Sequence, residues 1–116
     1  MTHPERDAEY LHHILEAIRR IRAYTSGKDK HVFLTELLLQ DAVIRNIEII
    51  GEAANRLSAE FVRSHMTVPW PDIAGMRHRL IHGYMTVNLQ IVWNVVEREL
   101  PNLEKQIKEI LKGEAG

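Results

Sequence analysis

Apolar residues recur at intervals of three and four positions along the chain, and no useful length of it alternates with period two. An interval of three or four places side chains on one face of an α-helix. The pattern therefore predicts an all-α protein, an up-and-down bundle of four to five helices. The first helix is expected over residues 4–25, with Thr2 and Glu5 forming a capping box around Pro4 and with Ser26-Gly27 ending it. Its apolar stripe consists of Leu11, Ile14, Leu15, Ile18 and Ile21.

The second predicted helix, over residues 30–57, carries too many apolar residues for one contact face. Three consecutive leucines occupy positions 37–39, and at 100° per residue they cover an arc of about 200°. The helix is therefore expected to pack on two sides, and a second copy of the chain would cover the outer side in a homodimer. The alternative is a central helix wrapped by its own chain. Gly51 would let a neighbouring helix come close.

Further helices are indicated by their end signals. Ser58 is expected to cap a short helical turn, and the Pro-containing stretch 67–71 that follows is expected to be extended. A third helix is predicted over residues 71–82, with Gly83 ending it in the left-handed conformation. Asn88 would cap a fourth helix, and Pro101 would kink it or divide it from a last amphipathic segment.

The composition limits the class of protein. The 116 residues suffice for a single domain over residues 1–116, and the 45% hydrophobic content allows a real core. The balance of 15 basic and 16 acidic residues creates no global positive field, so any phosphate binding must be local. A dimer could concentrate arginines in such a local groove, either Arg19, Arg20 and Arg22 or Arg45 and Arg56 on the polar side of the second helix, although solvated helix faces explain both sets equally well.

The absence of cysteine excludes disulfides, thiolate catalysis and cysteine-based metal sites, and it makes the reducing cytoplasm the expected location. The N-terminal sequence is not that of a secretory leader, and no apolar stretch approaches the about 18 residues of a membrane span. We therefore expect neither export nor membrane attachment.

Candidate chemistry is concentrated in residues 76–84, where Arg77, His78, Arg79 and His82 lie within six positions. A guanidinium can fork onto a phosphate, and an imidazole exchanges protons near neutral pH. Together they suffice for RNA cleavage without a metal or another cofactor. His82 would take the proton of a ribose 2′-hydroxyl, and Arg77 would stabilise the charge of the transition state, leaving a 2′,3′-cyclic phosphate.

Helix geometry constrains this pair. Residues five apart point about 140° from each other and lie about 7.5 Å apart along the axis. Arg77 and His82 can therefore meet only if the helix relaxes before Gly83 or if two subunits assemble the site. Both possibilities favour a site at a dimer interface.

Structural explanations exist for the same residues. Arginine and histidine near a helix C-terminus often bind free carbonyls and favour the helix dipole. His78 and His82 have the spacing of two metal ligands on one helical face, but no third ligand is apparent and Arg79 would repel a cation. We therefore expect no metal. Tyr84 and the two tryptophans, Trp70 and Trp93, have the alternative role of core or interface anchors.

The segment Arg77-x4-His82-x-Tyr84 resembles the Arg-x4-His-x-Tyr motif of the HepT-like members of the HEPN superfamily. The resemblance covers nearly the whole chain. It includes Ile47-Glu48-Ile49-Ile50-Gly51-Glu52-Ala53-Ala54, the approach from Trp70 to Arg77, Val92-Trp93 and Leu100-Pro101.

The resemblance implies a dimeric all-α toxin ribonuclease, with Arg77 and His82 as its catalytic residues. His78 stands where the family usually has Asn or Asp, and with Arg79 it would contact RNA phosphates. Tyr84 would accept AMP from a minimal nucleotidyltransferase antitoxin, since a bulky anionic adenylate two residues from His82 would fill the phosphate slot and repel RNA. The competing hypothesis is a non-catalytic helical module that docks a nucleotide or the partner nucleotidyltransferase through the same segment.

Overall fold

The first part of the chain folds into one long amphipathic helix. In the computed structural model, which describes residues 4–82 and 86–115, a short 3-10 turn η1 (Pro4–Arg6) leads into α1 (Asp7–Thr25). The helix thus begins at Asp7 and not at residue 4, and no side chain caps it at Arg6. Thr2 of the expected capping box lies outside the described residues. The predicted end is confirmed, because Gly27 adopts a left-handed φ of 72° just after α1.

The predicted second helix is divided in two, which corrects the expectation of a continuous helix over 30–57. It forms α2 (Lys30–Thr35) and α3 (Leu37–Asn55), separated by Glu36 in an extended conformation. A tertiary hydrogen bond stabilises the break, since the buried Gln40 side chain donates to the Phe33 carbonyl at 3.0 Å. The turn brings Phe33 into the core and leaves Leu37 and Leu38 outside it.

The next helices are short. Ser58 caps α4 (Ala59–Ser64) by accepting the Phe61 N–H at 3.1 Å, as predicted. The third predicted helix is wrong in two respects, because it is divided at Gly75 and ends before His82. It consists of α5 (Trp70–Ala74) and α6 (Met76–Leu80), and the His78 N–H donates to the Gly75 carbonyl three residues earlier, a tighter turn than that of an α-helix.

The C-terminal helical segments follow one another without an intervening loop. Asn88 caps α7 (Leu89–Asn94) as predicted, accepting the Ile91 N–H at 3.1 Å. A π-helical turn, η2 (Val95–Glu99), then leads into α8 (Leu100–Ala115). Here the Leu100 N–H donates to the Val95 carbonyl five residues earlier. This wide turn separates α7 from α8 directly before Pro101, close to the predicted kink or division.

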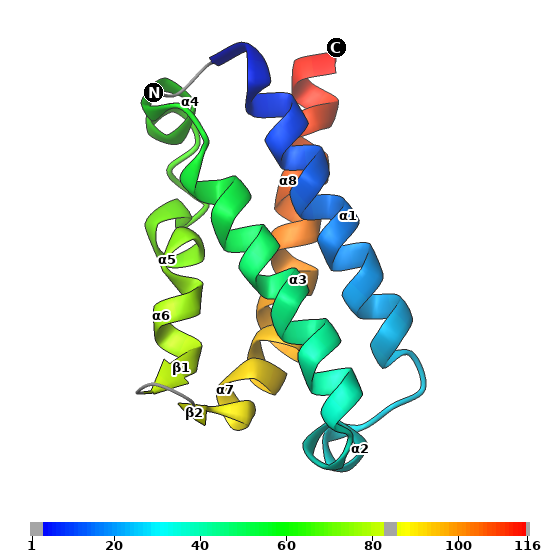
Figure 1. Cartoon of the computed structure of the whole chain (residues 1–116). Helices are drawn as coiled ribbons and strands as arrows, with labels where there is room; N and C mark the ends of the chain where they lie inside the picture. Colours follow the sequence, from blue (N-terminus) through cyan, green and yellow to red (C-terminus); the bar gives the residue numbers. More distant parts are fainter. Residues whose placement is uncertain (1–3, 83–85, 116) are drawn as a thin grey trace.

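The helices form an all-α bundle, as expected. Figure 1 shows α3 between α1 on one side and the α5–α6 segment on the other, with α8 behind and beside α1. Gly51 lets α5 approach α3 closely, because a Cβ at Gly51 would lie 3.3 Å from the Ile73 carbonyl oxygen. Both tryptophans are buried in the core, which confirms their role as anchors. Within the described residues, no helix is long and apolar enough to cross a bilayer.

One apolar patch is left uncovered at the start of α3. Leu37 and Leu38 are 75% and 83% exposed, whereas the adjacent Leu39 is buried. Only one of the three consecutive leucines is therefore accommodated by the chain itself.

Candidate active site

The segment with the candidate chemistry changes conformation between Arg77 and His82. Helix α6 ends at Leu80, and the chain continues as the two-residue strand β1 (Ile81–His82). It pairs antiparallel with β2 (Thr86–Val87), with His82 opposite Thr86. The Asn88 N–H closes this hairpin by donating to the Leu80 carbonyl at 2.7 Å. The backbone thus leaves the helix before His82, while the His82 side chain, Gly83 and Tyr84 lie outside the described residues.

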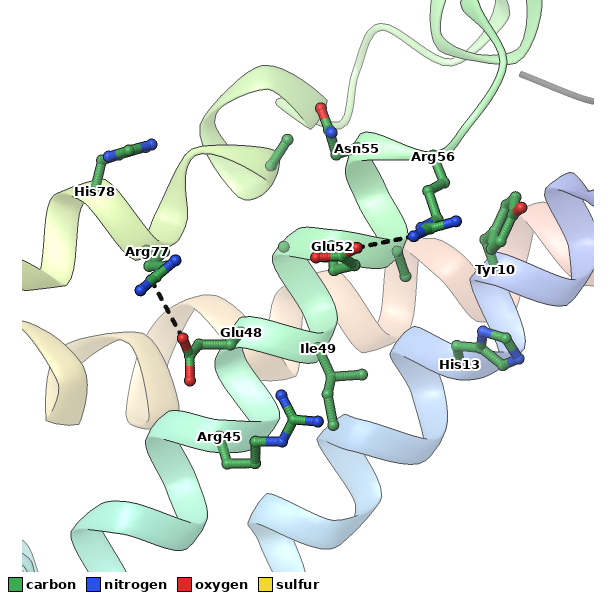
Figure 2. A pocket seen from close by; sticks show the side chains of 13 residues that line it. Tyr10, His13, Arg45, Glu48, Ile49, Glu52, Asn55, Arg56, Arg77 and His78 are labelled. Atoms are coloured by element: carbon green, nitrogen blue, oxygen red, sulfur yellow. Dashed lines mark hydrogen bonds and ion pairs between the residues drawn. The ribbon is translucent and has the colours of Figure 1, made fainter. Parts of the chain in front are cut away.

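Arg77 lies on the surface of α6 against α3. Its Nε lies 3.2 Å from Oε2 of Glu48, and the two side chains are 66% and 33% exposed. Figure 2 shows the guanidinium pointing from α6 toward the Glu48 carboxylate. A pair this exposed contributes about 0–1 kcal/mol to stability. Arg77 is therefore oriented by Glu48 and remains accessible to an anion from solvent.

An open polar groove of about 810 Å³ extends from this ion pair along α3. Its walls come from α1, α3 and the α5–α6 segment (Figure 2). Three arginines and two glutamates line it, together with two histidines, one tyrosine and one asparagine: Arg45, Arg56, Arg77, Glu48, Glu52, His13, His78, Tyr10 and Asn55. The lining is suited to a polar, charged ligand, because most of these side chains carry hydrogen-bonding groups.

Most of the charge in the groove is already paired. Arg56 donates to Glu52 at 3.0 Å one turn away on α3, and this hydrogen bond raises the pKa of Arg56 above its usual value. Arg77 is paired with Glu48. Arg45 is exposed, and within the described part of the chain it has neither a hydrogen bond nor an ion pair through its side chain.

His78 and Arg79, which were both expected to contact RNA phosphates, lie on different surfaces of the protein. His78 is exposed and lines the groove with Arg77. Arg79 instead forms two parallel hydrogen bonds with Glu99, at 3.1 and 2.9 Å, and the hydrogen bonding raises its pKa. It borders a different surface hollow, next to Asn88 at the start of α7. Arg79 would have to leave Glu99 to contact a phosphate in the groove.

Two further features of the site concern possible metal ligands and the partner of Arg77. No group of three or more metal-ligating side chains of the His, Cys, Asp or Glu type occurs within residues 4–82 and 86–115. The partner of Arg77 was not predicted, because Glu48 lies 29 positions earlier and on another helix. The available signal was that Glu48 belongs to the same family-like stretch as Gly51.

Comparison with known proteins places the chain in a family. Residues 14–110 match the family model described as "Ribonuclease HepT-like". A protein of Caldanaerobacter subterraneus subsp. tengcongensis named "Putative RNase TTE0752" is 45% identical over 105 residues, which cover 90% of this chain and 94% of the relative. The "Probable ribonuclease HepT" of Thermococcus cleftensis is 38% identical over 104 residues, covering 90% of this chain and 94% of the relative.

A third relative is longer than this chain. The "Gamma-glutamylcyclotransferase and putative RNase MJ0434" of Methanocaldococcus jannaschii is 46% identical over 103 residues, which cover 89% of this chain but 46% of that protein. Among solved structures there is no significant match. Because the family model spans most of the chain and the relatives align over nearly their whole length in two of these three cases, the chain belongs to the ribonuclease HepT-like family.

Proposed function

We propose that this protein is a metal-independent endoribonuclease that cleaves RNA with Arg77 and His82. The observation that carries the proposal is the exposed guanidinium of Arg77 at the wall of an open polar groove, in a chain of the ribonuclease HepT-like family. The Arg77 side chain is held by one partly exposed carboxylate, so a substrate phosphate can replace Glu48 at little cost.

The reaction assigns one task to each residue. His82 removes the proton from a ribose 2′-hydroxyl, and the 2′-oxygen attacks the adjacent phosphorus. The bond from phosphorus to the 5′-oxygen breaks, this oxygen takes a proton from water to leave as a 5′-hydroxyl, and His82 returns its proton to the solvent. The other product ends in a 2′,3′-cyclic phosphate. Arg77 stabilises the additional negative charge on the phosphoryl oxygens as the transition state forms.

The change from helix to strand after Leu80 supports this division of tasks. On a continuous helix the side chains of Arg77 and His82 would point about 140° apart. Because Ile81 and His82 form a strand, Arg77 and His82 are no longer fixed to different faces of one helix. In the proposal, two copies of the chain complete the site, and the exposed Leu37 and Leu38 supply apolar surface for their association.

The proposal includes regulation by a partner. A nucleotidyltransferase antitoxin would transfer AMP from ATP to the Tyr84 hydroxyl, forming a phosphodiester bond and releasing pyrophosphate. The adenylate would place negative charge two residues from His82 and repel RNA. Free protein would then be a toxin, and the modified protein would be inactive.

The decisive experiment is RNA cleavage in EDTA by the wild type and by the Arg77→Ala and His82→Ala variants. Loss of a general base lowers rates by about 10²–10⁴-fold and loss of a charge-stabilising donor by about 10²–10³-fold. His12→Ala and Arg98→Ala are matched controls, because both residues are exposed and lie outside the groove. We expect cyclic phosphate ends from the wild type and from both controls.

Three results would refute parts of the proposal. Undiminished cutting by His82→Ala would remove His82 from the mechanism, whereas binding of RNA that stays intact would indicate the non-catalytic module. For the regulatory part, mass spectrometry after co-expression with a small nucleotidyltransferase is expected to detect adenylate on the wild type and none on Tyr84→Phe. An adduct that persists on Tyr84→Phe would exclude this tyrosine as the acceptor.

A further inference from the structure

Arg45 is the one arginine of the groove lining that forms no ion pair among the described residues. The lining contains three arginines and two glutamates, and the pairs Arg77–Glu48 and Arg56–Glu52 account for both carboxylates. The positive charge left over is that of Arg45, which is exposed and without an ion pair in the described residues. An anion entering the groove can bind Arg45 without displacing a carboxylate.

Arg45 also lies in the appropriate position relative to the motif. It precedes Glu48 by three residues, so the two side chains share one face of α3 and lie about 4.5 Å apart along its axis. Both residues line the groove, and Figure 2 shows the Glu48 carboxylate turned toward Arg77 on α6 and the Arg45 guanidinium turned toward α1. Helices α3 and α6 run in opposite directions (Figure 1), so Arg45 is displaced from the Arg77–Glu48 pair toward the end of α6 at which His82 follows.

Arg45 reduces the electrostatic repulsion that a phosphate would meet at the Arg77–Glu48 pair. Glu48 orients Arg77, but its negative charge also repels an approaching phosphate. Arg45, one turn away, offsets that repulsion. The opposite end of the groove holds Arg56, which lies eleven residues and about 16 Å along the axis from Arg45. Successive nucleotides of a stacked strand rise by about 3.4 Å, and the distance from Arg45 to Arg56 is several times this rise. The groove therefore has room for neighbouring phosphates of one strand.

We propose that this groove is the binding track for an RNA strand and that Arg45 binds a backbone phosphate next to the one held by Arg77. The inference rests on the proposed ribonuclease function, since it assigns the substrate contacts of that same site. Arg45 thereby supplies affinity, whereas Arg77 supplies charge stabilisation in the reaction. Because the proposed contact of Arg45 is to a backbone phosphate and to no base edge, Arg45 would act on all RNA sequences alike.

The test is binding of a fluorescent single-stranded RNA of twelve nucleotides that carries 2′-O-methyl groups throughout and so cannot be cut by 2′-hydroxyl attack. Fluorescence anisotropy gives Kd between 50 and 300 mM NaCl for the wild type, Arg45→Gln, Arg45→Lys and the control Arg98→Gln. We expect Arg45→Gln to weaken binding about three- to tenfold at 50 mM NaCl. The slope of log Kd against log salt should decrease by about 0.7, the value for one phosphate of a single strand.

The controls separate charge from structure. Arg45→Lys should keep the salt slope of the wild type, and Arg98→Gln should keep both slope and affinity. Because Arg45 is exposed, all variants should melt within a few degrees of the wild type. Equal binding by Arg45→Gln and Arg98→Gln would overturn the inference, as would the absence of any binding by the wild type.

The same protein samples distinguish this inference from the proposed function. If the wild type binds the methylated strand through Arg45 but leaves ordinary RNA uncut, the cleavage proposal fails and the binding track stands. If ordinary RNA is cut equally by Arg45→Gln and Arg98→Gln, and both bind alike, the cleavage proposal stands and the role of Arg45 is refuted.

Discussion

A buried carboxylate at the start of α1 is predicted to hold α4 in place. Asp7 and Ser58 are 7% and 2% exposed, and 51 positions separate them. The Asp7 carboxylate accepts the Ser58 N–H at 2.8 Å and the Ser58 hydroxyl at 2.6 Å. The same hydroxyl oxygen accepts the Phe61 N–H at 3.1 Å and so caps α4. Asp7→Ala is expected to break this connection and to leave the Ser58 N–H buried without its acceptor.

The size of the effect follows from these contacts. A hydrogen bond to a charged group contributes about 1.5–3 kcal/mol, and a buried donor left unsatisfied costs about 1–3 kcal/mol. The Ser58 hydroxyl can rotate, whereas its N–H cannot, so we expect Asp7→Ala to lower the free energy of unfolding by about 2–4 kcal/mol. Ser58→Ala removes the cap and one hydrogen bond to the Asp7 carboxylate, which together should cost at least about 2 kcal/mol.

The measurement is urea unfolding followed by circular dichroism at one protein concentration, because association would make stability depend on concentration. Glu9→Ala, an exposed change in the same turn of α1, is the control and should stay within about 0.5 kcal/mol of the wild type. The double variant should cost less than the sum of the single variants, with a coupling of about 0.5–3 kcal/mol. A loss by Asp7→Ala no larger than that of Glu9→Ala would refute the reasoning.

Two further predictions concern helix packing and pH. Gly51→Val should lower the free energy of unfolding by about 1–3 kcal/mol, because its Cβ would lie 3.3 Å from the Ile73 carbonyl oxygen. Gly113→Val is the control and should change the free energy of unfolding little, because the space around its Cβ is open. Urea unfolding of both variants checks this, and equal stability of the two would contradict it. Hydrogen bonding from Arg19 lowers the pKa of Glu16 to about 2, from 4.5. A lowered folded-state pKa adds stability above pH 4.5 that is lost as the pH falls toward 2. The Tm difference between the wild type and Glu16→Gln should therefore shrink over this range in thermal melts, and an undiminished difference at pH 2 would argue against it.

Helix ends were predictable from the sequence where a local signal determines them. Ser58 and Asn88 cap the helices for which they were identified, because a side-chain oxygen binds an N–H three residues later. Gly27 ends α1 for an equally local reason, its left-handed φ. The break at Glu36 has no such signal. It depends on the Gln40 side chain reaching the Phe33 carbonyl, a contact that exists only in the folded chain.

The candidate site was predictable in its residue types and only partly in its geometry. The motif gave Arg77 and the groove residue His78, but the ion-pair partners of Arg77 and Arg79 come from other helices and cannot be derived from periodicity. Arg79 shows this most clearly, since Glu99 on η2 draws it to a surface away from the groove. Two arginines separated by one position thus lie in different surroundings.

Backbone packing, and not the Arg77–Glu48 ion pair, determines where Arg77 lies. At Gly51 the carbonyls of Ile73 and Ala74 approach α3 so closely that a Cβ would lie 3.3 and 3.4 Å from their oxygens. One turn after Ala74 comes Arg77, and one turn before Gly51 comes Glu48, so antiparallel helices in contact at Gly51 necessarily bring these two side chains together. The exposed ion pair adds about 0–1 kcal/mol to this arrangement. A phosphate can therefore take the place of Glu48 while the helices, and with them the arginine, stay where the packing holds them.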